Sequence, residues 1–121
     1  MSNQLKAIIN ANVVLETGII WDGVIVLDGD KIREVGSEHE VAIPEGAEII
    51  DANGKYVGPG FVDIHVHEGN GVSTNEEPVK AAEFFLKHGT TSMLATPFYA
   101  MDFDRLMKAF KTIKENMPLA K

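Results

Sequence analysis

Two hydrophobic patterns follow one another along the chain, with the change near residue 58. Before that point, short apolar runs are separated by Asn, Asp and Gly residues, which is typical of short β-strands joined by turns. The pattern predicts these strands: Lys6–Leu15, Trp21–Leu27, Lys31–Val35 and Glu48–Asp51. Asp28-Gly29-Asp30 predicts a tight hairpin between the second and the third strand. The first part of the chain is therefore expected to form a small sheet.

The second pattern begins after the breaker cluster Gly58-Pro59-Gly60. Phe61–Val66 is an almost continuous apolar run, which predicts a strand buried on both faces of a parallel sheet. Thr74 or Asn75 can cap a helix that follows, because apolar residues recur at helical spacing up to residue 86.

A second strand and a second helix complete this part of the chain. Thr90–Thr96 is rich in β-formers, and Asp102 can cap a helix whose apolar face begins at Phe103. The order strand, helix, strand, helix predicts parallel strands joined by right-handed crossovers. Two strands cannot close a barrel, so we expect the chain to be the N-terminal fragment of a longer protein.

Composition narrows the classes of function. The 121 residues carry 11 basic and 18 acidic side chains, a net charge of −7, which disfavours nucleic acid and anionic membrane surfaces as partners. No cysteine is present, so a metal ion would have to be held by histidines and carboxylates. No apolar run approaches the roughly 20 residues that span a bilayer, and the N-terminus lacks a secretory signal, so a cytoplasmic location is expected.

The candidate site is the pair His65 and His67 at the end of the Phe61–Val66 run. Residues two apart on a strand point to one face, about 7 Å apart along the chain, so the two imidazoles can share one metal ion. Asp63 has the same parity, and it either orients an imidazole or bonds to backbone. Glu68 follows the pair as a possible further carboxylate. The alternative is that His65 and His67 are structural residues of the strand, with hydrogen bonds to backbone and no metal.

Two other histidines are expected to have no catalytic role. His88 precedes a glycine that ends the predicted helix, so we expect it to interact with the negative end of the helix dipole. His39 lies in a polar segment and is expected at the surface.

Three segments in order carry a family resemblance: Asp51–Lys55, Pro59–His67 and His88–Thr96. With them the chain resembles the amidohydrolase superfamily, and within it the N-acetylglucosamine-6-phosphate deacetylase subgroup. Glu68 departs from the pattern, since a glycine usually follows the second histidine in that family.

The resemblance implies an α/β fold. Residues 1–58 would be part of a small β-sandwich domain, and residues 59–121 would be the first βαβα units of a metal-dependent (β/α)8 TIM barrel, incomplete here. His65 and His67 would hold one or two divalent metal ions, zinc first, with iron or manganese as other choices. The remaining ligands and the catalytic Asp would lie beyond Lys121.

The resemblance also implies an activity. The full-length enzyme would deacetylate N-acetylglucosamine 6-phosphate, a small amino-sugar phosphate, to glucosamine 6-phosphate and acetate, and it would be a homo-oligomer. The fragment itself would be inactive. Two alternatives remain: another amidohydrolase, such as a dihydroorotase-like or dihydropyrimidinase-like cyclic amidase or a deaminase, and a non-catalytic β-rich binding module.

Overall fold

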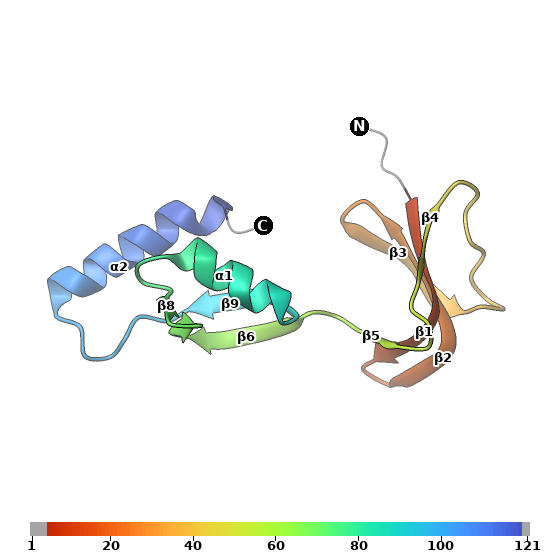
Figure 1. Ribbon diagram of the computed structural model, residues 1–121, viewed down its shortest axis with the longest axis horizontal. Helices are drawn as coiled ribbons and strands as arrows, with labels where there is room; N and C mark the ends of the chain where they lie inside the picture. The colour runs from red at the N-terminus through yellow and green to blue at the C-terminus, as the bar shows by residue number, and fades with distance from the viewer. Residues whose placement is uncertain (1–4, 120–121) are drawn as a thin grey trace. The chain divides into compact units, whose positions relative to one another are not determined.

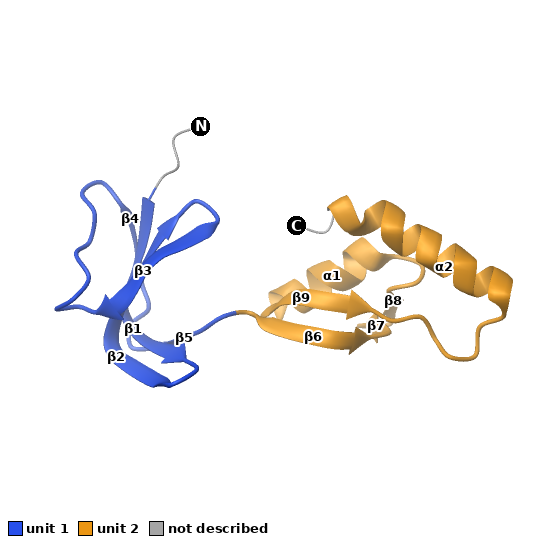
Figure 2. Ribbon diagram, turned by 180° about the vertical axis from the view of Figure 1, so that it is seen from behind, with its two compact units in different colours: residues 1–59 blue, residues 60–121 orange. Residues whose placement is uncertain are grey.

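The computed structural model describes residues 5–119 (Figure 1), and the chain divides into two compact units. The first unit ends at Pro59 and the second begins at Gly60 (Figure 2). The change of hydrophobic pattern near residue 58 therefore coincides with a change of architecture, from a sheet alone to strands alternating with helices.

The first unit is a mixed five-stranded sheet. Its strands are β1 (Leu5–Leu15), β2 (Gly18–Asp28), β3 (Lys31–Ser37), β4 (Glu48–Asp51) and β5 (Tyr56–Val57). The order is β3-β2-β1-β4, and β5 also pairs with β1. The pairs β1–β2 and β2–β3 are antiparallel, whereas β4 and β5 run parallel to β1. The strands β1 to β4 and the turn at Gly29-Asp30 agree with the sequence pattern, with ends that differ by up to three residues, whereas β5 was not predicted.

Apolar side chains are buried on both faces of this sheet. Neighbouring residues of β2 belong to different clusters, because side chains along a strand alternate between faces. Ile25 packs with Ala11 and Val13, while Val24 and Val26 pack with Val41. The long continuous apolar run of β2 is explained by this double burial, whereas a sheet covered on one face would show alternation.

The turn after β4 is fastened to the middle of β1. The Asn10 side chain donates to the Asp51 carboxylate at 2.9 Å, and the backbone N–H of Asn53 donates to the same oxygen at 2.8 Å. These donors, Asn10 first, hold the pKa of the Asp51 carboxyl below its ordinary value, because each stabilises the charged form. The contact spans 41 residues of sequence, and the strand pattern alone gave no sign of it.

The second unit has the predicted order of strand, helix, strand and helix. Its elements are β6 (Phe61–Val66), β7 (Glu68–Gly69), β8 (Val72–Ser73), α1 (Pro78–Lys87), β9 (Thr90–Ala95), α2 (Phe103–Asn116) and the 3₁₀ turn η1 (Met117–Leu119). β6 and β9 are parallel, and β7 and β8 form a small antiparallel hairpin that the hydrophobic pattern did not predict. Two parallel strands do not make a barrel, so the structure shows an α/β unit and no closed TIM barrel.

One of the two predicted helix caps is present in the structure and the other is not. The Asp102 carboxylate accepts from the backbone N–H of Arg105 at 2.8 Å, so the predicted cap of α2 is confirmed. The prediction of a cap at Thr74 or Asn75 was wrong, because α1 begins at Pro78 with Glu77 as a cap residue that makes no side-chain bond. Thr74 and Asn75 are buried instead, and the side-chain amide of Asn75 has no hydrogen-bond partner within residues 5–119.

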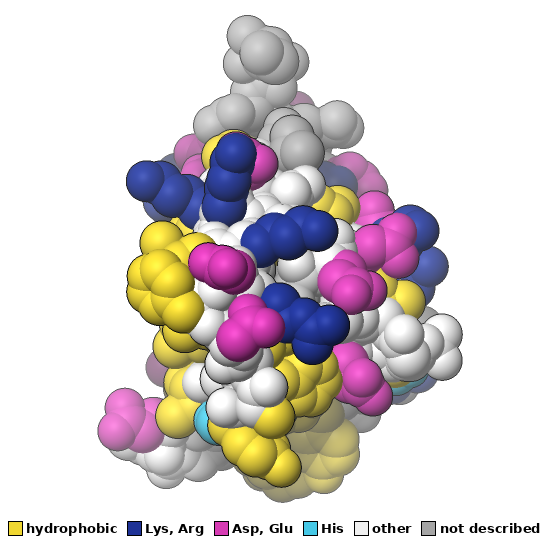
Figure 3. All heavy atoms as spheres, turned by 90° about the vertical axis from the view of Figure 1, so that its left-hand side faces the viewer, with side chains coloured by type: hydrophobic (Ala, Val, Ile, Leu, Met, Phe, Trp, Pro, Cys, Tyr) yellow, Lys and Arg dark blue, Asp and Glu magenta, His cyan; other side chains and the backbone are white. Residues whose placement is uncertain are grey.

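Strand β6 is much less buried than its apolar sequence suggested. Phe61 is 71% exposed, Val62 69% and Ile64 73%, whereas Val66 is 3% exposed. Within the described part of the chain β6 pairs with β9 alone, so its apolar side chains lack the covering elements that a continuous apolar run anticipates. Figure 3 shows one face of the molecule, where side chains of both charges mix with hydrophobic side chains at the surface.

Neither described helix is long and apolar enough to cross a membrane.

Gly60, at the start of the second unit, allows a close approach that a larger residue would prevent. A Cβ placed there would lie 2.7 Å from the Cβ of Thr91, an atom that cannot rotate away. We expect Gly60→Ala to destabilise the unit by about 1–3 kcal/mol, as overpacking does. Urea unfolding followed by the helical circular-dichroism signal measures this.

Gly58→Ala is the matched control, because a Cβ at Gly58 would meet Val14 only at an ordinary 3.4 Å. Equal unfolding midpoints for the two variants would contradict the packing described here.

Candidate metal centre

The two candidate histidines lie where the parallel strands β6 and β9 both end. His65 is in β6 and His67 follows its last residue, and their rings turn toward each other. The two Nε2 atoms are 3.0 Å apart, and the ring planes cross at 76°. The two imidazoles lie on the same side of the strand, as predicted, because the residues are two positions apart. The structure shows in addition that the two Nε2 atoms point at each other.

The other nitrogen of His67 contacts the end of the neighbouring strand. His67 Nδ1 lies 2.7 Å from the backbone carbonyl oxygen of Thr96, the residue after β9. A carbonyl oxygen only accepts, so we assign the ring hydrogen to Nδ1. In the neutral ring, Nε2 then carries the lone pair, and this lone pair faces His65. A histidine that binds a metal is held in its tautomer by such a bond.

The spacing of the two Nε2 atoms fits a shared ion. Two metal–nitrogen bonds of about 2.0–2.1 Å separate the nitrogens by about 2.9 Å when they meet at a right angle and by about 3.3 Å when they meet at the tetrahedral angle. The observed 3.0 Å agrees with this geometry. Within residues 5–119 no group of three or more His, Asp or Glu side chains is placed to hold a metal. The described chain therefore provides two converging donors and not a complete set.

Asp63 and Glu68 are placed differently from each other. The Asp63 carboxylate accepts from the backbone N–H of His65 at 3.0 Å, so it bonds to the strand and not to an imidazole. Glu68 is exposed in β7, opposite Ser73. Asp63 thus braces the backbone that carries His65, while Glu68 lies directly after the histidine pair.

Thr74 fastens the end of β6 from the other side. It is fully buried, its hydroxyl donates to the carbonyl oxygens of His67 at 2.9 Å and Val66 at 3.3 Å, and its backbone N–H donates to His67 at 2.9 Å. The His67 carbonyl thereby receives both of its donors from Thr74, while the Val66 carbonyl also accepts from the N–H of Thr96 at 2.7 Å. Thr74 therefore fixes the backbone on which His67 sits.

The hairpin after the histidines packs closely on α1. A Cβ on Gly69 would lie 2.7 Å from a ring carbon of Phe84 and 2.8 Å from one of Phe85, so the absence of a side chain lets the hairpin reach the helix. His88, as expected, interacts with the C-terminal end of α1, where its Nδ1 lies 2.8 Å from the carbonyl oxygen of Phe84. His39 is exposed, also as expected.

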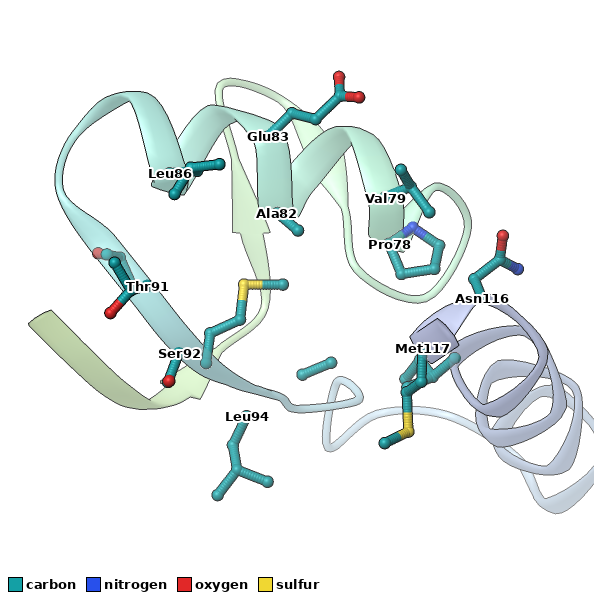
Figure 4. Close-up of a pocket in the computed structure, with 14 residues that line it drawn as sticks. Pro78, Val79, Ala82, Glu83, Leu86, Thr91, Ser92, Leu94, Asn116 and Met117 are labelled. Atoms are coloured by element: carbon teal, nitrogen blue, oxygen red, sulfur yellow. The ribbon is translucent and has the colours of Figure 1, made fainter. Parts of the chain in front are cut away.

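An apolar hollow of about 640 Å³ lies elsewhere in this unit, between α1, β9 and the C-terminal end of α2 (Figure 4). Side chains such as Ala82, Leu86 and Met117 line it, and neither His65 nor His67 does. The hollow adjoins the free edge of β9 and carries a single carboxylate, Glu83, so it is not the candidate site.

Sequence reasoning missed two groups that contact the histidine pair. The Thr96 carbonyl contacts His67 across 29 residues, and the Phe98 ring stacks on His67 with centroids 4.8 Å apart and planes 9° apart. The sequence pattern predicted Thr96 only as the last residue of the second parallel strand. The available signal was position: both residues follow a parallel strand, at the edge where active sites of α/β barrels form.

Comparisons with known proteins agree with the resemblance in the sequence. No family model matches the chain. A dihydroorotase of Lactobacillus johnsonii is 33% identical over 94 residues, which are 77% of this chain and 21% of the relative. An adenine deaminase of Staphylothermus marinus is 33% identical over 116 residues, 91% of this chain and 19% of the relative.

Among solved structures, N-acetylglucosamine-6-phosphate deacetylase from Pasteurella multocida superposes with a TM-score of 0.77 at 28% identity. The match covers 94% of this chain and 31% of the deacetylase chain. The chain spans about a fifth of the length of the curated relatives it matches. These relatives are hydrolases of carbon–nitrogen bonds, and the chain resembles a part of such amidohydrolases in sequence and in fold.

The Thr74 hydroxyl offers a test of the anchored strand end. Thr74→Val keeps the shape of the side chain but removes the donor to the Val66 and His67 carbonyls, so we expect a loss of about 1–2 kcal/mol. The helical signal in urea unfolding measures it. Thr91→Val, at an exposed position of β9, is the control and should change little. Equal losses in both variants would show that the hydroxyl does not anchor β6.

Proposed function

We propose that this chain supplies the first part of a metal-dependent hydrolase of carbon–nitrogen bonds, in which His65 and His67 are two ligands of a divalent metal ion. The supporting observation is the convergence of their Nε2 atoms at 3.0 Å, with the His67 tautomer set by the Thr96 carbonyl. Residues 1–58 would belong to a small β-sandwich domain, and residues 59–121 would begin a (β/α)8 barrel. The uncovered apolar residues of β6 and the hollow beside β9 support this, because further βα units would cover both.

The chemistry divides between the metal and the chain. When bound, the metal would activate a water molecule and polarise the scissile amide carbonyl. His65 and His67 would each give their Nε2 lone pair to it, for which His65 must carry no hydrogen on Nε2, and the Nδ1 hydrogen of His67 stays with the Thr96 carbonyl. His67 is therefore a ligand and not a proton carrier. Asp63 accepts a hydrogen bond from the backbone of His65, and Glu68 is proposed as a carboxylate near the metal that does not bind it directly. The catalytic acid–base group would come from outside these 121 residues.

We propose N-acetylglucosamine 6-phosphate as the substrate, with glucosamine 6-phosphate and acetate as products. The support is the likeness to the Pasteurella multocida deacetylase, which extends over both units of the chain. Two imidazole donors make zinc the first choice of metal, since zinc takes nitrogen ligands readily. We also propose, on the resemblance alone, a cytoplasmic homo-oligomer, and the net charge of −7 supports a small-molecule substrate over nucleic acid or membrane.

A cyclic amide or an aminopurine is the second candidate substrate. The relatives found by sequence include a dihydroorotase and an adenine deaminase, each 33% identical to this chain over the matched residues. An assay of the complete enzyme with three compounds separates the candidates: N-acetylglucosamine 6-phosphate, dihydroorotate and adenine. Turnover of the first alone supports the deacetylase, and turnover of either other compound alone contradicts it.

The histidine pair is tested in the complete enzyme by metal content and rate. His65→Ala and His67→Ala each remove one ligand, so we expect metal content to fall and kcat to fall by about 100-fold or more. His88→Ala is the matched control, because its ring bonds the end of α1, and it should keep metal and rate. Full metal and full rate in both ligand variants would show that the pair is structural.

The 121-residue chain alone is expected to be inactive. It carries two converging donors and, within residues 5–119, no third side chain placed to complete the site. A purified sample tested with N-acetylglucosamine 6-phosphate should release no acetate. Acetate release that disappears in His65→Ala would contradict this and would place the whole catalytic machinery within the chain.

A further inference from the structure

The Phe98 ring lies flat on the imidazole of His67. The ring centroids are 4.8 Å apart and the planes differ by 9°, while His65 meets the same imidazole edge-on at 76°. His67 is thus in contact on one face with an aromatic ring, at Nδ1 with a carbonyl oxygen, and at Nε2 with its partner histidine. Phe98 is the one of these neighbours that touches the face of the ring.

The chain path after β9 explains how one segment makes two of these contacts. Pro97 fixes its own φ and disfavours the helical region for Thr96, so the chain leaves the strand in an extended form. The Thr96 N–H still donates to the carbonyl oxygen of Val66 at 2.7 Å, which keeps the segment beside β6. The Thr96 carbonyl and the Phe98 side chain are thereby both directed at His67.

A hydrogen bond at Nδ1 by itself leaves the imidazole free to rock about that bond. A flat aromatic neighbour removes this freedom, because rotation of the imidazole would drive its edge into the phenyl ring. Phe98 is 36% exposed, so it is not a core residue placed by general packing. Its position is accounted for by the contact with His67.

We propose that Phe98 is a positioning residue for the His67 imidazole, holding the ring plane so that Nε2 faces the Nε2 of His65. Its purpose rests on the proposed metal site, but the contact itself exists without a metal and can be tested separately. The Phe98 side chain has no polar atom that could bind the metal or the substrate, so Phe98 would act only through His67.

The test uses nuclear magnetic resonance of the histidine rings in the 121-residue chain, at a pH above the ordinary histidine pKa of about 6.5. In the parent chain we expect a single Nδ1–H tautomer for His67, upfield-shifted ring protons and a nuclear Overhauser contact with Phe98. Phe98→Leu should abolish the upfield shift and weaken the nuclear Overhauser contacts between the rings of His67 and His65, because the plane of the His67 ring is no longer held. Phe98→Tyr keeps the flat ring and should restore the parent spectrum.

Zinc titration followed by the same signals gives a second readout. Phe98→Leu should lower the zinc affinity about tenfold, in the range seen when a group that orients a metal ligand is lost. Phe103→Leu is the matched control: the same substitution at a phenylalanine that is 74% exposed in α2 should change neither spectrum nor affinity.

The outcomes separate this proposal from the function proposed above. Unchanged contacts between the two histidine rings and an unchanged zinc affinity in Phe98→Leu would overturn the positioning role, whatever the enzyme does. If Phe98→Leu fails to fold, the parent chain decides, because absence of the contact between Phe98 and His67 there overturns the proposal. If the spectra change as expected while His65→Ala and His67→Ala leave zinc binding intact, positioning stands and the metal-site function fails.

Discussion

The parallel pairing of β6 with β9 is the interaction on which the candidate site depends. The two strands end at the same edge, and the last bond of their ladder joins the Thr96 N–H to the carbonyl oxygen of Val66. This bond sets the Thr96 carbonyl beside His67, which fixes the hydrogen on Nδ1 and leaves Nε2 to face His65. A slip of one residue between the strands would remove the carbonyl and turn the side chains to the other face.

Around this pairing, the structure holds the end of β6 by bonds to its backbone as well as to its side chains. The Asp63 carboxylate accepts a hydrogen bond from the N–H of His65. The hydroxyl and the backbone N–H of Thr74 both donate to the carbonyl oxygen of His67. Both act before any ligand is bound, so the two imidazoles are held close to the geometry that a metal requires. Such preorganisation reduces the cost of ordering ligands when the ion arrives.

The sequence predicted the elements well, because local patterns determine them. The longer strands and the Asp102 cap came from spacing or from neighbouring residues, and the same reasoning led to the proposal of His65 and His67 as ligands. The sequence did not predict contacts between residues that lie far apart along the chain. Thr74 looked like a helix cap because its neighbours resemble a helix start, yet its hydroxyl serves a strand end. The roles of Thr96 and Phe98 depend on the register between β6 and β9, which no local pattern contains.

The apolar run of β6 shows a second limit of local patterns. Phe61, Val62 and Ile64 were expected to be buried on both faces, and they are exposed because β9 is the only strand beside them in the described residues. The prediction was sound for the strand and wrong for its surroundings in this chain. The same exposure supports the proposal that residues 59–121 begin a larger barrel, since the chain spans about a fifth of the length of its curated relatives.

The central claim is that His65 and His67 bind one ion through their Nε2 atoms. Crystals of the complete enzyme soaked with zinc, with anomalous diffraction data collected at the zinc absorption edge, test it most directly. We expect one anomalous peak bonded to both Nε2 atoms at about 2.0–2.1 Å, with the Nδ1 of His67 still bonded to the Thr96 carbonyl. A zinc ion held elsewhere, with the two imidazoles still bonded to each other, would contradict it.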